Sequence, residues 1–179
     1  NRTLLKFFCE LISNTLDQNI IINQILPSLG QLIEVYSLSH QDNRDPNLLL
    51  VFTRILDQLK NTDYNYIVLI WKHLCLFTLN MIKLDYHSFP EHRMNFFILL
   101  KSLITNAFDS LFKVQEANFN KDVIDTITWA IRHDQPSMYE TGLETLLILI
   151  QKIYQFKFVN GMNIADLFLR AYYMNILND

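Results

Sequence analysis

His87, Glu91 and His92 form the most ligand-like cluster in this 179-residue chain. A zinc site needs three or four ligands whose spacing brings them to one point, such as two histidines one helical turn apart. Here Glu91 and His92 are adjacent and diverge by about 100° on a helix, and no further ligand follows at such a spacing. We therefore predict no metal site and expect a loop-to-helix junction whose polar groups cap the helix.

A cysteine and a histidine also lie close together, at His73 and Cys75. A nucleophilic pair needs a base within hydrogen-bond reach and a third group that orients it. Residues two apart on a helix point in different directions, so we expect these two side chains to pack in the core.

The remaining polar residues give no catalytic pattern. Paired acids can transfer protons only where a pocket raises the pKa of one of them, and the carboxylates here fit solvated helix faces. Gly30, Gly142 and Gly161 stand singly, outside any phosphate-binding pattern. We predict that the chain is not an enzyme and holds no cofactor. A helical enzyme domain with a hidden acid pair or metal stays open as an alternative.

The composition predicts long helices and limits the classes of partner. Half of the residues are hydrophobic and 18% are charged, against about 25% in an average soluble domain. Three glycines and four prolines are few for a fold with many tight turns. The net charge of −3 argues against binding to a nucleic-acid backbone. No uninterrupted apolar run reaches the roughly 18 residues of a membrane span, so we expect no membrane partner.

Apolar residues recur at helical spacing along almost the whole chain. Pro27 lies inside the second expected helix, and a bent or late-starting helix is expected there because proline removes one backbone donor. The expected helices cover about 3–16, 20–37, 45–59, 64–84, 88–108, 118–132, 135–155 and 163–177.

The helices form a repeating pattern of pairs. The third, fifth and seventh each have a proline in the first turn, at Pro46, Pro90 and Pro136. Pairs recur about every 45–55 residues, near the 40–47 of HEAT-type repeats. We predict an all-α, α-α superhelix (a HEAT-repeat solenoid) of about eight antiparallel helices. Residues 1–179 would be one segment of a larger solenoid: a trailing helix, about three full hairpins and the first helix of the next.

Four patches carry a family resemblance. Residues 79–97, LNMIKLDYHSFPEHRMNFF, closely resemble a run that reads TLNMI, a short linker and PEHR-x-NFF in the exportins of the importin-β (karyopherin) superfamily. Met94 occupies the variable position. Residues 125–133, DTITWAIRH, resemble that family's DSIIWAFKH, and 141–151 resemble its TGLQ-x-L-x-x-LLQ. A weaker match to LKLIS lies at 4–13.

The resemblance implies the C-terminal third of a receptor for leucine-rich nuclear export signals. Such a receptor binds its cargo together with GTP-bound Ran, contacts nucleoporins and shuttles between nucleus and cytoplasm through the nuclear pore. The segment in hand would be scaffold that helps to close the ring and touches Ran on the inner helices, which are the third, fifth and seventh. Candidate contact positions on them are Glu91, Arg93, Lys101, Glu140 and Glu144. Solvation of a concave wall is the alternative role for each.

The family's other functional parts are expected outside these residues. Its cargo groove and its reactive groove cysteine lie in repeats N-terminal to this segment, so neither Cys9 nor Cys75 inherits that role. A HEAT-type scaffold or regulatory subunit of another assembly is the competing interpretation, and only the PEHR-x-NFF and DTITWAIRH matches separate the two.

Overall fold

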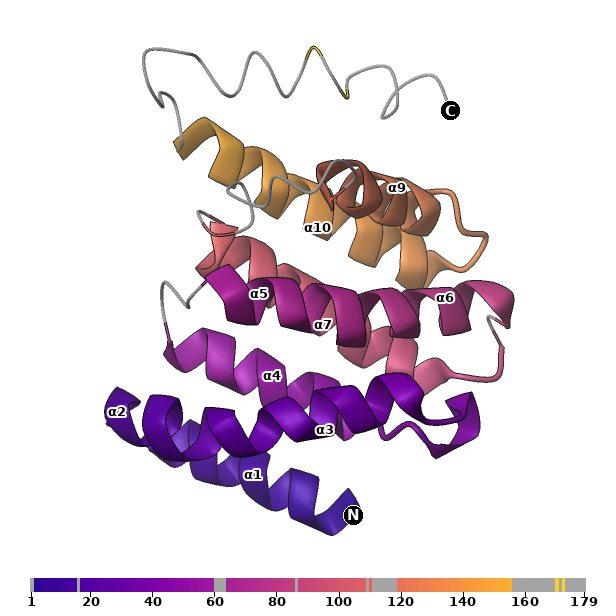
Figure 1. Cartoon of the computed structure of the whole chain (residues 1–179). Coiled ribbons are helices and arrows are strands. Elements are labelled where there is room, and N and C mark those ends of the chain that lie inside the picture. Colours follow the sequence, from indigo (N-terminus) through magenta and orange to yellow (C-terminus); the bar gives the residue numbers. More distant parts are fainter. Residues whose placement is uncertain are drawn as a thin grey trace. The chain divides into compact units, whose positions relative to one another are not determined.

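The chain folds into two compact units, Asn1–Leu111 and Phe112–Asp179. The computed structural model describes residues 2–15, 17–59, 64–85, 87–108, 110, 119–155, 170 and 172 (Figure 1). All regular elements among these residues are helical, which confirms the all-α prediction. The eighth expected helix, 163–177, lies outside the described residues except at positions 170 and 172.

The first unit consists of helices that follow one another with short connections. Its elements are α1 (Arg2–Asn14), α2 (Gln18–Ile20), η1 (Ile21–Ile25), α3 (Leu26–Leu38), η2 (Gln41–Asn43), α4 (Asn47–Gln58), α5 (Tyr64–Ile70), η3 (Trp71–Cys75), α6 (Leu76–Leu84) and α7 (Pro90–Asn106). Helix α4 packs between α1 and α7, while α3 lies against η3 (Figure 1). Corresponding helices therefore stack on corresponding helices, as in a HEAT-type array.

Stacking on both sides explains the composition of the middle helices. On α4 the fully buried side chains include Leu49, Phe52 and Ile55, and on α7 they include Phe96 and Leu103. A helix with a single buried face would need one apolar stripe. Helix α7 is buried over more than half of its circumference, so it needs partners on several sides.

Two π-helical turns interrupt the longer helices. The second helix begins at Gln18, earlier than expected, and passes Pro27 by means of the turn η1, in which the N–H of Leu26 donates to the carbonyl of Ile21. A π turn next to a proline relieves the clash with the preceding carbonyl. The turn η3 was not predicted. In it the N–H of Leu76 donates to the carbonyl of Trp71.

The start of α4 combines an aspartate whose side chain caps the helix with a proline in the first turn, and only the proline was predicted above. Asp45 Oδ1 accepts the backbone N–H of Asn47 at 2.9 Å. Pro46 has helical dihedral angles, with φ −62° and ψ −20°. Asp45 is thus the cap and Pro46 the first helical residue in conformation.

The second unit contains the hairpin of α9 (Phe119–Ile131) and α10 (Pro136–Gln155), which pack against each other. The buried residues of α10 recur at helical spacing: Met138, Gly142, Thr145, Leu149 and Ile153. At Gly142 the backbone of α10 lies close to the backbone of α9. A Cβ at this position would lie 2.8 Å from Ile131 N and 3.1 Å from Ala130 C.

One helical stretch is more apolar than the lack of long uninterrupted apolar runs suggested. Residues Asn65–Leu84 form a 20-residue helical stretch with a mean hydropathy of 1.5, long and apolar enough to cross a membrane by length and composition. Half of it is buried inside the protein. The core helix of a soluble protein has the same properties, so this finding by itself assigns no membrane span.

We expect Gly142→Ala to destabilise the second unit by about 1–3 kcal/mol, because the backbone of α9 must move to admit the methyl group. Gly30 lies inside α3 with nothing within 4 Å of an added Cβ, so Gly30→Ala should stabilise its helix by about 0.5–1 kcal/mol. Amide hydrogen exchange in α9–α10 and in α3 measures both effects. Equal behaviour of the two variants would contradict the close approach.

Candidate partner-binding surface

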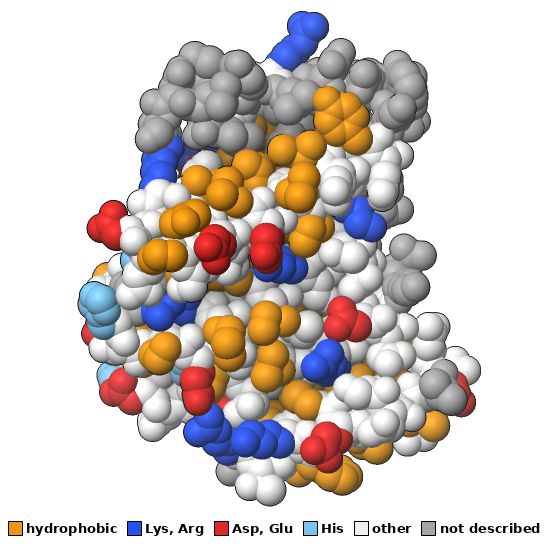
Figure 2. Space-filling view, turned by 180° about the vertical axis from the view of Figure 1, so that it is seen from behind, with side chains coloured by type: hydrophobic (Ala, Val, Ile, Leu, Met, Phe, Trp, Pro, Cys, Tyr) orange, Lys and Arg blue, Asp and Glu red, His pale blue; other side chains and the backbone are white. Residues whose placement is uncertain are grey.

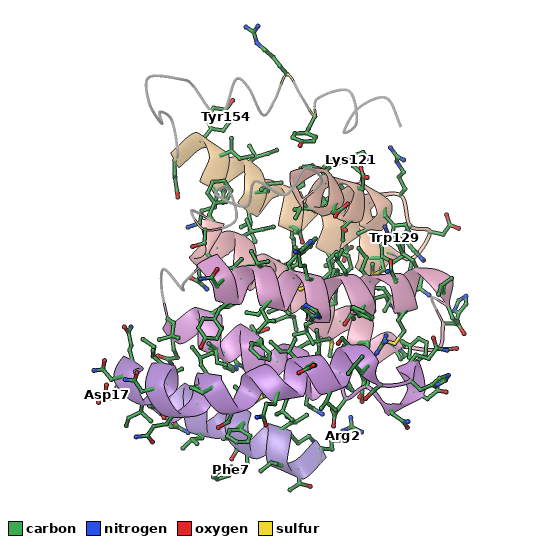
Figure 3. All side chains as sticks on the ribbon, in the orientation of Figure 1. Arg2, Phe7, Asp17, Lys121, Trp129 and Tyr154 are labelled. Atoms are coloured by element: carbon green, nitrogen blue, oxygen red, sulfur yellow. The ribbon has the colours of Figure 1, made fainter. Side chains whose placement is uncertain are left out.

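The five candidate contact residues lie on α7 and α10, as the sequence predicted. Glu91 lies in the first turn of α7 and pairs with Arg2 of α1, with 2.6 Å between Glu91 Oε2 and Arg2 Nη2. Arg2 lies in the first turn of α1 (Figure 3). Both side chains are more than half exposed. An ion pair this exposed is screened by water and salt and contributes little to stability, so Glu91 remains accessible at little cost.

The other candidates differ in exposure. Arg93 and Lys101 are half-buried, whereas Glu140 and Glu144 are exposed. Glu140 and Glu144 are four residues apart and share one face of α10. Glu91 and Arg93 are about 200° apart around α7, so the α7 candidates do not form a single patch on their helix.

His92 has a structural role, unlike that of a metal ligand. It is 7% exposed, and its Nε2 lies 2.9 Å from the carbonyl oxygen of Arg44, to which it donates. Its ring lies edge-on to Phe89, with 5.8 Å between the centroids. Burial lowers the pKa of His92 below its ordinary value. Within the described ranges, no three His, Cys, Asp or Glu side chains come close enough to hold a metal.

Arg44 makes several polar contacts in the first unit, and the sequence analysis gave it no role. Its Nε donates to the carbonyl of Tyr36 at 3.1 Å. Nη2 donates to Ser37 and Nη1 to Phe77, each at 3.4 Å. The guanidinium carbon also lies 5.5 Å from the ring centroid of Tyr36 and 5.3 Å from that of Phe77. Arg44 therefore caps the C-terminal end of α3 and ties it to α6.

Neighbouring polar contacts join the same loop to the other helices. Asn95 Nδ2 of α7 donates to the carbonyl of Pro46 at 3.0 Å. The hydroxyl groups of Tyr36 and Thr78 lie 2.7 Å apart in the core, and burial raises the pKa of Tyr36 to about 12. We name Tyr36, Arg44, Thr78, His92 and Asn95 the loop clamp, because together they join residues 36–46 to α6 and α7.

A second polar contact joins α4 to α7 near their C-terminal ends. Ser102 Oγ donates to Asp57 Oδ1 at 2.7 Å, and Asn106 Nδ2 donates to the same oxygen at 3.0 Å. Arg54 Nη1 lies 3.9 Å from the other carboxylate oxygen. Asp57 thus fixes the register between α4 and α7 while it stays partly exposed.

The cysteines show no nucleophilic setting. Cys75 is completely buried, and burial raises the pKa of its thiol. The pKa of Cys9 is also raised, first by partial burial. A reactive thiol needs a lowered pKa and access to solvent. Neither thiol therefore has the environment of a reactive cysteine.

Comparison with known proteins gives matches over the full chain. The family model described as CRM1 C terminal matches residues 1–179. Exportin-1 of Schizosaccharomyces pombe is 31% identical over 179 residues, which covers 99% of this chain. Exportin-1 of Dictyostelium discoideum is 30% identical and Protein EXPORTIN 1A of Arabidopsis thaliana 31% identical, each over 98% of it. The chain spans 16% of the length of each of these relatives.

The loop clamp should be a main source of stability for the first unit. We expect Arg44→Met to lower the free energy of unfolding by about 1–3 kcal/mol, because carbonyls of α3 and α6 lose a charged donor. Arg54→Met is the matched control, since Arg54 is exposed and makes one long ion pair. Urea denaturation measures both. A larger loss in the control would refute the role of Arg44.

The buried His92 should make stability depend on pH. Its pKa is lower in the folded chain than in the unfolded chain, where it is about 6.5. As pH falls below that value, the unfolded chain binds the proton first, so the free energy of unfolding falls. We expect His92→Gln, which keeps a donor toward the Arg44 carbonyl, to show a smaller loss between pH 7.5 and pH 5. A loss of the same size in His92→Gln as in the wild type would contradict this role of His92.

Proposed function

Because the chain belongs to the CRM1 C-terminal family of the exportins, we propose that it is the C-terminal scaffold of a nuclear export receptor. In this proposal the whole protein binds cargo with a leucine-rich export signal together with GTP-bound Ran. It carries that cargo through the nuclear pore and shuttles between nucleus and cytoplasm. The observation that carries the proposal is similarity to three exportins over nearly the whole chain.

The stacked helices fit a mechanical role for this segment. In a HEAT-type array each repeat contacts only its neighbours, so curvature changes by small steps at each hairpin. Binding at one site can then alter affinity at another through the shape of the array. We propose that residues 1–179 act as one such segment, helping to close the ring of the receptor. Cargo would bind in repeats outside this chain.

GTP-bound Ran would contact the inner helices α7 and α10, at Glu91, Arg93, Lys101, Glu140 and Glu144. The exposure of Glu91, Glu140 and Glu144 supports this assignment. Figure 2 shows exposed hydrophobic side chains with charged side chains of both signs beside them. Mixed surfaces of this kind are common at protein–protein interfaces. Nucleoporins would be further partners.

The proposal predicts that the full-length protein binds a leucine-rich export peptide more tightly when GTP-loaded Ran is present. The double variant Glu140→Lys with Glu144→Lys should weaken Ran binding about 5- to 20-fold and slow association most at low salt. Glu34→Lys is the control, because Glu34 is an exposed acid on α3. Surface plasmon resonance measures both effects. An affinity for the peptide that is the same with and without GTP-loaded Ran would refute the receptor proposal. Equal effects of the double variant and the control would refute only the contact assignment.

A further inference from the structure

Helix α10 carries an exposed apolar face in addition to the buried one described above. Tyr139, Leu143, Leu147 and Tyr154 are between 39% and 57% exposed, and we name these four residues the α10 stripe. At about 100° per residue, they fall within about 80° of one another around the helix. Tyr154 lies at the C-terminal end of α10 (Figure 3). The stripe is about 22 Å long, because each residue of a helix adds about 1.5 Å.

The members of the stripe are neighbours along the helix. Tyr139, Leu143 and Leu147 follow one another at a spacing of four residues, which places their side chains side by side. The half-buried Ile150 lies on the same face between Leu147 and Tyr154. A single exposed leucine needs no explanation, whereas a contiguous apolar row rimmed by polar residues marks an interaction surface.

The helical period of the stripe favours a helix as its occupant. Ridges of side chains on one helix pack into grooves on another, and the shared period keeps two apolar rows beside each other along their length. An amphipathic helix binds in this way through apolar residues three and four positions apart. The α10 stripe spans about four turns, enough to bury the apolar face of such a helix.

An acidic edge runs beside the stripe. Glu140 and Glu144 are exposed and lie about 20° and 60° past Leu147 around α10. Lys152, the only base in the sequence of α10, is half-buried and lies about two turns beyond Glu144. Lysine or arginine side chains of a partner would therefore meet carboxylates beside the N-terminal half of the stripe. Opposite charges placed in this way speed association and select one orientation of the partner.

This charge pattern argues against two occupants from the chain itself. Helix α10 of a second copy would bring two acids and one base, with no basic excess. The helix expected at 163–177 carries one acid and one base in its sequence, so it offers no match either. The charge complement of the stripe is a helix with a basic edge.

We propose that the α10 stripe docks a basic amphipathic helix of a separate protein. Apolar side chains of that helix would pack on Leu143 and Leu147 between the two tyrosine rings, and its basic side chains would face Glu140 and Glu144. Tyrosine rings suit such a surface because they give a large contact area and are enriched at interfaces. This docking site goes beyond the Ran contact proposed above, because its apolar residues are not part of that contact and its occupation needs neither Ran nor cargo.

The test uses the full-length protein and a fluorescein-labelled peptide of about 18 residues, long enough to form a helix, with leucines three and four residues apart and lysines along one edge of the leucine row. Fluorescence anisotropy should show saturable binding that Leu143→Ala with Leu147→Ala weakens at least about 10-fold. Both leucines are about half exposed, so the fold should survive, which circular dichroism checks. Leu38→Ala with Leu84→Ala is the matched control, since it removes two exposed leucines from helix ends in the first unit. That control should bind the peptide as the wild type does.

Two further peptides test the helix and the charge separately. A peptide of the same composition in scrambled order has no apolar face and should bind at least about 10-fold more weakly. A peptide with glutamates in place of the lysines should also bind at least about 10-fold more weakly at low salt, and salt should reduce the difference. Glu140→Lys with Glu144→Lys should reverse the preference, so that this variant binds the glutamate peptide more tightly than the lysine peptide.

Four results would overturn the proposal: no saturable binding, equal losses in the stripe and control variants, equal binding of the ordered and scrambled peptides, or no effect of Glu140→Lys with Glu144→Lys on the preference. Light scattering that shows dimers of the wild type and monomers of Leu143→Ala with Leu147→Ala would assign the stripe to a second copy and overturn it as well. None of these results bears on the Ran-dependent cargo test, which measures binding of an export peptide.

Discussion

Burial of single helices on more than one side is the constraint on which this structure depends. Helix α4 contacts both α1 and α7, and its side chains from Leu49 to Leu56 are largely removed from water. No helix of this kind can satisfy its apolar surface alone, so it is stable only within a stack. The same constraint explains why the chain is rich in hydrophobic residues and poor in charged ones. It leaves polar chemistry to the ends of helices and to the exposed faces of α7 and α10.

The loop clamp provides hydrogen-bond donors for carbonyl groups at the end of α3. Where α3 ends, its last carbonyl groups have no partner within the helix. Arg44 supplies donors to Tyr36 and Ser37 and reaches Phe77 on the neighbouring helix. The carbonyl group of Arg44 in turn accepts the ring N–H of His92 on α7. One loop thus fixes three helices relative to one another.

Buried helix interiors and exposed helix surfaces have different roles in this structure. The interiors carry buried residues that set the spacing between helices, as Gly142 does through its lack of a side chain where α10 meets α9. The carboxylates of Glu140 and Glu144 on α10 are exposed instead. Surfaces of this second kind can change their chemistry without loss of the fold, so a scaffold of this type can acquire binding sites along its length.

The sequence by itself determined the all-α class, the approximate limits of the described helices and the family. Apolar spacing of 3.6 residues and capping residues such as Asp45 are local signals, and the run at 79–97 is specific. The loop clamp was decided only by tertiary structure. The carbonyl groups that accept from the Arg44 guanidinium lie up to 33 residues away in the chain. His92, which donates to the Arg44 carbonyl, lies 48 residues away. Neither contact produces a periodic pattern in the sequence. The turn η3 was also missed, because one extra residue in a helical turn does not alter the apolar composition. Local propensity encodes each helix, whereas the contacts between helix ends follow from how the stack brings distant residues together.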